Sequence, residues 1–541
     1  MPPKNASPTG PKLPVQQLAI LAVVRFAEPL AYTSVFPYLP EMIRDFGVEQ
    51  NKIARWAGLT SAVFSVAQSI TAVPWGRGAD RYGRKPMIIL GLLSTMLTFI
   101  VWGMSTTLPM AIVARAIQGG GNGNVGIIRT MVAEMVPERE LQPRAFSVMP
   151  LVWSLGSVVG PSFGGFFAHP ARQWPSFFGK MAYFRTFPYA LPNLVAGIFF
   201  LISVAVASLF LRETLPGKRD ERDWGISVGR RLTRAFKRRG HRSSASSQHP
   251  RRSSFVDGEA TAPLIPANVV SHKKNSTTNS PPSTREVFTR DTVINLVAYT
   301  FLAFHSVAYD QNLPVFLNYP RIRDVGAPVH LPFSFQGGFG LTSGEIGTIF
   351  TCYGVACGLI QFLIYPTLVS RYGVLHCFRV CSLILPVTYF LTPYTALFDS
   401  GTGRYVSLAF IMFVKGFSII IAFPSTTILL TNSCSSVRVL GTLNGFATSF
   451  SGLGRAAGPL LTGLAFTWGA ENGFIFVPYA FLSFIALLGA IPVFMAVEGD
   501  GPSATPDESD AEDVLPNESA IEEEDEDSER DERSPLLTRA R

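Results

Sequence analysis

Residues 75–85 read WGRGADRYGRK and lie between two long apolar runs. The stretch places five charged side chains and three glycines within eleven residues. Asp80 follows Gly76 by about one helical turn, so both face the same side of a helix. Gly76 would let a neighbouring helix approach closely, and Gly83 allows a tight turn after which Arg84 folds back toward Asp80. The alternative is a loop that only sets membrane topology through its positive charge.

The composition around this stretch is that of a membrane protein. The chain has 541 residues, of which 47% are hydrophobic and 16% charged, against about 25% charged in an average soluble domain. A scan with a window of about 19 residues finds twelve apolar stretches, each near the length that a bilayer requires. The sequence therefore predicts an all-α membrane protein with twelve transmembrane helices. The expected spans are 16–39, 56–76, 86–104, 108–131, 146–168, 188–211, 292–317, 344–366, 376–397, 404–430, 440–468 and 473–496.

The spans fall into two groups of six, separated by a segment of different composition. This segment contains RRLTRAFKRRGHRSS at 230–244 and little that a core could bury, so we expect it to be disordered. Basic loops stay in the cytoplasm, which with an even number of spans places both termini there. The predicted organisation is a cytoplasmic tail 1–15, a six-helix bundle 16–211, a disordered basic cytoplasmic loop 212–290, a six-helix bundle 291–497 and an acidic disordered cytoplasmic tail 498–541.

The two groups of helices also repeat in sequence. RYG at 81–83 recurs at 371–373, and SLGSVVGPSFGG at 154–165 is echoed by GLGRAAGPLLTG at 452–463. Such echoes predict two pseudo-symmetric bundles related by an axis along the membrane normal. Ser370 stands where Asp80 would be in the second copy, so we expect the pairing of Asp80 with Arg84 to have no counterpart there.

Ionisable residues inside the spans are functional candidates by default. Aligning 26–39 with 303–316 places Glu28 opposite His305, and Thr33 opposite Asp310. The alternative for Glu28 is a pair with Arg25, three residues earlier on its own helix face. Lys415 and Arg455 are further candidates, for which a purely structural role is an equal alternative.

Three motifs resemble those of the major facilitator superfamily of secondary transporters. Gly76-x3-Asp80-Arg81-x-Gly83-Arg84-Lys85 resembles the signature of its loop between helices 2 and 3, which implies a gating network. In helix 4, Arg115-x2-Gln118-Gly119 resembles the motif whose buried arginine is linked to proton coupling. A snorkelling arginine is the alternative. In helix 5, Gly156-x3-Gly160-Pro161-x2-Gly164-Gly165 resembles the antiporter pattern, in which small residues pack helices closely and the proline bends the helix.

Within the superfamily, the sequence is similar to the drug:proton antiporter group and especially to zinc-induced facilitators. It lacks their Cys-Pro-Gly-Cys element and His-rich central loop. The resemblance implies proton-coupled efflux of small organic compounds by alternating access, with helices 1, 4, 7 and 10 around a central cavity. Glu28 and His305 would lie nearest the proton and substrate, and polar contacts would come from Asn122, Asn124 and Gln361.

Other functions remain open or are disfavoured by the sequence. The alternatives are a transporter-like receptor without net flux, or an importer or facilitator of an organic acid, metal chelate or other small solute. An enzyme is not expected, because no nucleophile–base spacing or phosphate-binding loop appears. The cysteine spacings match no zinc site, and we expect no cofactor, no metal and no nucleic-acid partner. We expect a monomer in the plasma membrane, although an acidic dileucine pattern at 532–537 favours a vacuolar or endosomal membrane.

Overall fold

The structure, a computed structural model, describes residues 13–136, 141–215, 217–219, 223–240, 288–321, 330–433 and 437–499. The acidic tail predicted for 498–541 and its dileucine pattern therefore lie, from residue 500 onward, outside the described residues. Within those residues the secondary structure is helical, apart from a few isolated β-bridges.

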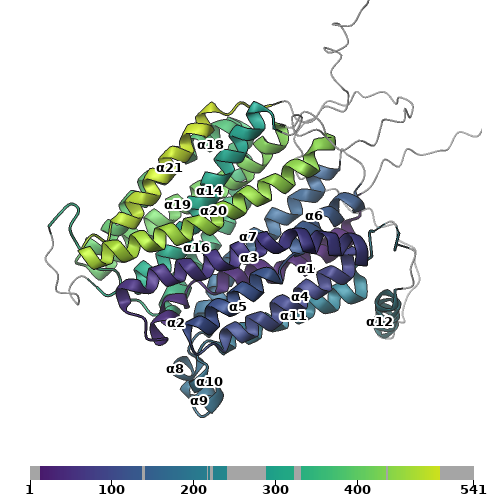
Figure 1. Cartoon of the computed structure of the whole chain (residues 1–541), viewed down its shortest axis with the longest axis horizontal. Helices are drawn as coiled ribbons and strands as arrows, with labels where there is room; N and C mark the ends of the chain where they lie inside the picture. The colour runs from purple at the N-terminus through teal and green to yellow at the C-terminus, as the bar shows by residue number, and fades with distance from the viewer. Residues whose placement is uncertain are drawn as a thin grey trace, which may run out of the picture. The chain divides into compact units, whose positions relative to one another are not determined.

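The first half of the chain supplies six spans, two of which are divided into two helices (Figure 1). The spans are α1 with α2 (Val15–Ser34, Leu39–Asp45), α3 (Ile53–Tyr82), α4 (Arg84–Gly103), α5 with α6 (Leu108–Gly120, Asn124–Met135), α7 (Gln142–Phe167) and α11 (Ala190–Phe210). Short helices accompany them: η1 (Gln50–Lys52), α8 (Pro170–Gln173), α9 (Pro175–Phe178) and α10 (Ala182–Thr186).

The second half supplies six more spans, which Figure 1 colours from teal to yellow. They are α14 (Arg290–Asn318), α16 with η2 and α17 (Ser343–Leu359, Ile360–Ile364, Tyr365–Tyr372), α18 with η3 (Val374–Leu391, Thr392–Leu397), α19 (Gly401–Asn432), α20 (Val437–Asn472) and α21 (Val477–Met495). The twelve predicted spans are thus all present among the described residues.

Length and composition identify many of these helices as membrane-spanning without further information. Six described helices are long and apolar enough: α4, α11, α14, α18 with η3, α19 and α21. Two bent pairs bring the number to eight: α1 with α2, bent by 54°, and the two parts of α3, bent by 45°. The other four spans, α5 with α6, α7, α16 with α17, and α20, pack directly against these helices.

The glycine motif of α7 and its echo in α20 carry the internal symmetry. A Cβ atom at Gly156 or Gly160 would overlap α1 at Pro29 and Leu30. In the second half, a Cβ atom at Gly454 or Gly458 would overlap α14 in the same way. Each glycine pair therefore lets two helices of one bundle pack backbone to backbone. The predicted pseudo-symmetric bundles are confirmed.

The last glycines of the same motifs join the two bundles. Gly164 packs on the Ser34 carbonyl within the first bundle, but Gly165 packs on the backbone of Gly347 in α16. The symmetry-related Gly463 packs on Ala54 in α3. α7 continues as one helix through Pro161, which is buried. These cross-bundle contacts lie at the end of the helices where α1 finishes and α14 finishes, which we call the far end.

The opposite end, where α1 and α14 begin and α11 finishes, is called the linker end. It contains a helix that the sequence interpretation did not anticipate. The predicted disordered loop 212–290 includes α12 (Trp224–Gly240) at this end (Figure 1). The segment is basic, but its apolar and cationic residues recur with the period of an amphipathic helix. Contacts with α11 hold this helix in place.

Candidate transport site

We give the name central belt to seven charged side chains that the structure describes in the spans of the two bundles. Five are cations and two are carboxylates, so the belt carries more positive than negative charge. Its members are Arg25, Glu28, Arg115, Arg129, Asp310, Lys415 and Arg455.

The second bundle contributes an ion pair between two helices. Lys415 of α19 pairs with Asp310 of α14, and Lys415 Nζ also lies 3.3 Å from the hydroxyl oxygen of Tyr353 in α16. The ring of Tyr309 lies 5.0 Å from the same ammonium group, within range of a cation–π contact. The Lys415 side chain is 2% exposed and that of Asp310 is 34% exposed. The carboxylate is therefore the member of the pair that faces an open space.

The first bundle contributes an ion pair within one helix. Arg25 and Glu28 of α1 contact each other, with side chains 8% and 3% exposed. The Arg25 guanidinium also lies 5.8 Å from the ring of Trp153 in α7. This is the alternative that the sequence offered for Glu28. Arg129 and Arg455 interact electrostatically with Arg25, so two further cations lie near the pair.

Arg115 is a buried cation held by aromatic rings. It is 3% exposed, and its guanidinium lies 4.4 Å from the ring centroid of Trp102 in α4. Its Nη1 donates to Gln118 Oε1 at 3.1 Å, whereas its Nε has no partner. Within the described part of the chain no carboxylate pairs with it. Arg115 thus faces the bundle interior, and it does not snorkel to an interface.

The two bundles meet in the belt at Tyr32 of α1. The amide of Gln311 in α14 lies 3.4 Å from the Tyr32 hydroxyl and donates to it. Arg115 from the first bundle and Arg455 and Asp310 from the second bundle all interact electrostatically with this tyrosine. Tyr32 therefore stands where charges of opposite bundles come together, although no motif marked it.

His305 lies inside the second bundle, whereas the sequence interpretation expected it, like Glu28, to line the central cavity. Its Nδ1 lies 2.9 Å from the hydroxyl of Tyr389 in α18, and it lines a small cavity inside the second bundle. Helical geometry explains the difference. His305 and Asp310 are five residues apart on α14, so their side chains point to different sides of the helix. Asp310 faces the belt and His305 faces the core.

The three predicted polar contacts are scattered. Asn124, at the start of α6, is fully buried against Gly91 of α4, and neither of its side-chain polar atoms has a partner. Asn122 lies in the break between α5 and α6, where Gln68 of α3 donates to its backbone carbonyl at 3.1 Å. Gln361 lies in the π-helical turn η2 and is partly exposed. The structure brings none of them to the Asp310–Lys415 pair.

A second charged site, the clasp, lies at the linker end. Arg84 Nη1 donates to Asp80 Oδ1 at 2.5 Å, which is the fold-back that the spacing suggested. Its other guanidinium nitrogens donate to Glu134 Oε1 of α6, at 2.9 and 3.2 Å. Gly83 makes the turn with φ of 106°, and its echo Gly373 has φ of 81°. Positive φ of this kind favours glycine.

Lys85 and the start of α4 are held from the chain that follows α11. Lys85 Nζ donates to Asp223 Oδ2 at 2.6 Å and to the Ser208 carbonyl at 2.8 Å. The carboxylate of Glu213 accepts from the backbone N–H groups of Arg84 and Lys85, at 2.9 and 3.0 Å. An acidic side chain at a helix N-terminus satisfies unpaired N–H groups and complements the helix dipole.

Two members of the loop motif behave differently from the sequence interpretation. A Cβ atom at Gly76 would meet nothing within 4 Å, so no helix approaches closely there. The reason is that this face of α3 points away from the packed interior at the linker end. Arg81 is exposed, with its guanidinium 5.6 Å from the Tyr82 ring, and takes no part in the clasp.

Polar groups at the far end form a third site, which sequence reasoning missed. Glu41 Oε1 accepts from the backbone N–H of Ser343 at 2.8 Å, and its Oε2 lies 2.9 Å from His169 Nε2. Tyr319 donates to Asn51 at 2.7 Å. Two of these contacts, Glu41–Ser343 and Tyr319–Asn51, join residues of opposite bundles. Separations of some 300 residues leave no local sequence signal.

Metal ligands do not gather in this region. In the ranges that the structure covers, no group of three His, Cys, Asp or Glu side chains is placed to hold a metal ion.

Comparison with known proteins agrees with this architecture. The family model of the Major Facilitator Superfamily matches residues 21–328 and 325–538. The chain belongs to the major facilitator superfamily. It is therefore a transporter of small molecules and a multi-pass membrane protein, as the loop motif and the twelve spans predicted.

Relatives place it more narrowly. The chain is 37% identical over 515 residues to the major facilitator superfamily multidrug transporter mfsB of Aspergillus fumigatus, covering 90% of this chain and 84% of that protein. It is 25% identical over 491 residues to Protein Zinc Induced Facilitator-Like 1 of Arabidopsis thaliana, covering 89% and 91%. The predicted similarity to zinc-induced facilitators is confirmed.

Solved structures share the fold at low sequence identity. A bacterial homologue of the human lysosomal transporter Spinster, in an inward-facing and occupied conformation, matches with a TM-score of 0.58 and 13% identity, covering 92% of this chain and all of that one. The D-xylose–proton symporter matches with a TM-score of 0.57 and 12% identity, covering 90% and 98%. At these identities the likeness concerns the fold alone.

Proposed function

We propose that this transporter exports small organic compounds in exchange for protons by alternating access. The observation that carries the proposal is the presence of one carboxylate–cation pair within the spans of each bundle, Arg25–Glu28 and Asp310–Lys415. Ionisable groups inside a membrane are costly and mark proton or substrate pathways. The multidrug transporter to which the chain is 37% identical supports the same kind of substrate.

The Asp310–Lys415 pair supplies a coupling step. A proton that binds Asp310 removes its charge and leaves Lys415 buried beside the Tyr353 hydroxyl and the rings of Tyr309 and Tyr353. Loss of the carboxylate charge leaves the buried Lys415 ammonium group uncompensated, which is unfavourable. The protonated state is therefore disfavoured unless substrate release or bundle movement compensates. Proton binding and substrate binding then exclude each other, as exchange requires.

Glu28 is the second proton site in this proposal. Its carboxylate is more buried than that of Asp310, so it exchanges protons only when the bundles move and admit water. Arg115, which donates to Gln118, and Arg455 keep the electrostatic potential around this site positive. Each proton that enters contributes about 2.3 kcal/mol per 100 mV of membrane potential. One proton for one substrate would suffice for a useful gradient.

The orientation follows from charge. The linker end carries α12 and the basic residues 230–239, so we place it in the cytoplasm together with both termini. The clasp of Asp80, Arg84 and Lys85 would then gate the inner side, and we assign the transporter to the plasma membrane as a monomer. The close helix packing at Gly156, Gly160, Gly164 and Gly165 would close the transporter on its outer side.

A second candidate, passage of an organic acid, is favoured by one observation. Arg115 is buried, its Nε has no hydrogen-bond partner, and no carboxylate pairs with it among the described residues. A substrate with a negative charge would compensate this cation. In that case import or facilitated passage would replace drug export.

Sealed vesicles that contain the purified protein separate these functions. Pyranine trapped inside reports protons, while rhodamine 6G or benzoate serves as the organic cation or anion. We expect an imposed pH gradient to drive rhodamine 6G against the direction of proton flow. Benzoate movement with the protons would instead support the organic-acid function. If neither compound moves and protons do not respond to them, the exchange proposal is contradicted and a receptor role is favoured.

A further inference from the structure

α12 is fastened to the ends of two membrane-spanning helices. The residue before it, Asp223, pairs with Lys85 at the start of α4. Gly225 and Gly229 lie so close to α11 that a Cβ atom would overlap the carbonyl oxygens of Ser208 and Leu209. Because α4 begins and α11 ends here, α12 lies at the level where these helices leave the membrane.

The exposed surface of α12 is cationic. Residues 224–240 contain six Lys or Arg and no Asp or Glu. Of these, Arg230, Arg231 and Arg234 are described and exposed. None of the three forms an ion pair with a carboxylate that the structure describes. The helix thus presents positive charge without an internal partner.

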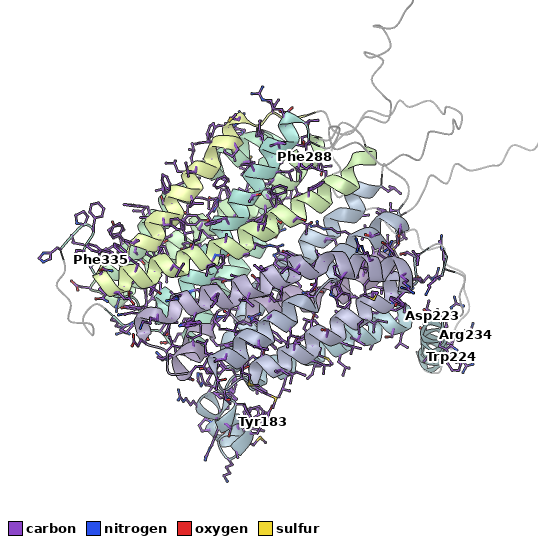
Figure 2. The ribbon with its side chains drawn as sticks, in the orientation of Figure 1. Tyr183, Asp223, Trp224, Arg234, Phe288 and Phe335 are labelled. Atoms are coloured by element: carbon purple, nitrogen blue, oxygen red, sulfur yellow. The ribbon has the colours of Figure 1, made fainter. Side chains whose placement is uncertain are left out.

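An apolar edge lies beside the cations. Trp224 is 81% exposed and Val228 is 43% exposed, and four residues apart they share one face of the helix. At 100° per residue, Arg231 falls next to Trp224 on the helix surface, and Arg234 and Arg230 follow on the same side. Figure 2 shows Trp224 and Arg234 on α12 beside Asp223. Tryptophan next to cations is typical of helices in the membrane–water interface.

We propose that α12 lies in this interface and binds the anionic headgroups of phospholipids in the bilayer that holds the transporter. The phosphate and carboxylate groups would contact Arg230, Arg231 and Arg234, while Trp224 and Val228 enter the acyl boundary. This binding does not depend on which solute the protein carries or in which direction. Through the Asp223–Lys85 pair, the lipid contact is adjacent to the clasp.

A rival occupant is the acidic segment IEEEDEDSERDE at 521–532 of the same chain. Charge complementarity alone would suit both. Two observations favour the lipid: the attachment of α12 at the ends of α4 and α11, and the exposed apolar edge, which an acidic segment would leave uncovered. Lipid supplies both the charge and the apolar boundary.

The test uses the full-length protein in detergent with equal amounts of phosphatidylcholine and phosphatidylserine, and counts bound lipids by native mass spectrometry. In the variant Arg230→Gln, Arg231→Gln, Arg234→Gln we expect the affinity for phosphatidylserine to fall about a hundredfold, since each cation near an anionic surface contributes about fivefold. Phosphatidylcholine binding should not change.

The matched control removes three exposed cations from the far end, as Arg172→Gln, Lys180→Gln and Arg185→Gln. It should retain the preference for phosphatidylserine. An equal loss in both variants, or no loss in the α12 variant, overturns the proposal. Truncation before Ser503 should also leave the preference unchanged. If only the truncated protein binds phosphatidylserine, the acidic segment occupies α12 and the proposal is wrong.

Discussion

The two ends of the transporter use opposite devices to hold their helices. At the far end, Gly165 and Gly347 place two backbones in contact across the bundles, and Glu41 accepts from the Ser343 backbone N–H. At the linker end, the clasp contacts of Arg84 and Lys85 all lie within the first half of the chain. The bundles are thus joined by close packing at one end, whereas the clasp at the other end holds helices of a single bundle.

This difference shows which end can change at low cost. Contacts between backbones lose about a quarter to a half of their attraction when helices separate by about 0.5–1 Å, which favours one arrangement at the far end. Exposed ion pairs tolerate displacement and exchange partners with water. Near the linker end, the bundles still meet where Arg129 contacts Thr448. We infer that the structure is closed at the far end and that the ion pairs of the clasp can rearrange when the linker end moves.

The largest effect on transport should come from adding a side chain to the close backbone contact at the far end. Gly165→Val would place a side chain against the Gly347 backbone, which costs about 1–3 kcal/mol when the packing cannot yield. We expect transport in sealed vesicles to fall by tenfold or more, while protein abundance stays normal. Gly126→Val is the matched control, because its Cβ atom meets nothing within 4 Å. Normal transport in Gly165→Val would show that the far end does not need to close.

A substitution in the central belt should have the next largest effect on transport, because the belt lies between the two ends. Glu28→Gln fixes a neutral side chain of the same size and leaves Arg25 buried without its carboxylate. We expect loss of pH-driven efflux with preserved substrate binding, since Arg25 still packs on Trp153. Rhodamine 6G flux at several imposed pH gradients measures it. A wild-type pH profile in this variant would show that Glu28 is not a proton site and would leave that role to Asp310.

The matching change in the other bundle is Asp310→Asn, which leaves Lys415 unpaired. A double variant with Lys415→Met removes both charges, so it should recover abundance but not pH-driven flux. Recovery of both would mean that the pair is only structural. His305→Ala should alter the pH profile less than either carboxylate variant, because His305 contacts Tyr389 and lines a small cavity inside the second bundle.

The clasp allows a smaller and more selective test. Asp80 is 66% exposed and Glu134 is 23% exposed, and both pair with Arg84. We expect Asp80→Asn to cost under about 1 kcal/mol of stability, as exposed pairs do, and Glu134→Gln to cost more because its pair is better shielded. Thermal unfolding in detergent compares the stability losses of the two variants. A larger loss for Asp80→Asn would mean that Asp80 has a partner in the other bundle in a second conformation.

The sequence predicted what is local and missed what is distant. Hydropathy identified the twelve spans because each lies within one run of residues, and Arg84 reaches Asp80 because they are four residues apart. The partners Asp223 for Lys85 and Lys415 for Asp310 lie 138 and 105 residues away, beyond any local pattern. Alignment of the repeats made His305 the pseudo-equivalent of Glu28, which fixes the height along the helix but not the direction of the side chain.

The smallest effect concerns the attachment of α12 at the linker end. Burial opposes ionisation of Asp223, but hydrogen bonds from Lys85 and the backbone N–H of Ile226 outweigh it and hold the pKa of this carboxyl below its ordinary 3.8. A depressed pKa contributes stability that is present above the unfolded value and lost only as the pH falls through the folded value. Amide hydrogen exchange in α12, corrected for intrinsic rates, should therefore be constant between about pH 5 and pH 8. Asp223→Asn should increase the exchange rate less than tenfold throughout this range, because Lys85 still donates a hydrogen bond to the Ser208 carbonyl. Protection that changes steadily across this range in the wild-type protein would show that another titrating group, and not Asp223, fastens the helix.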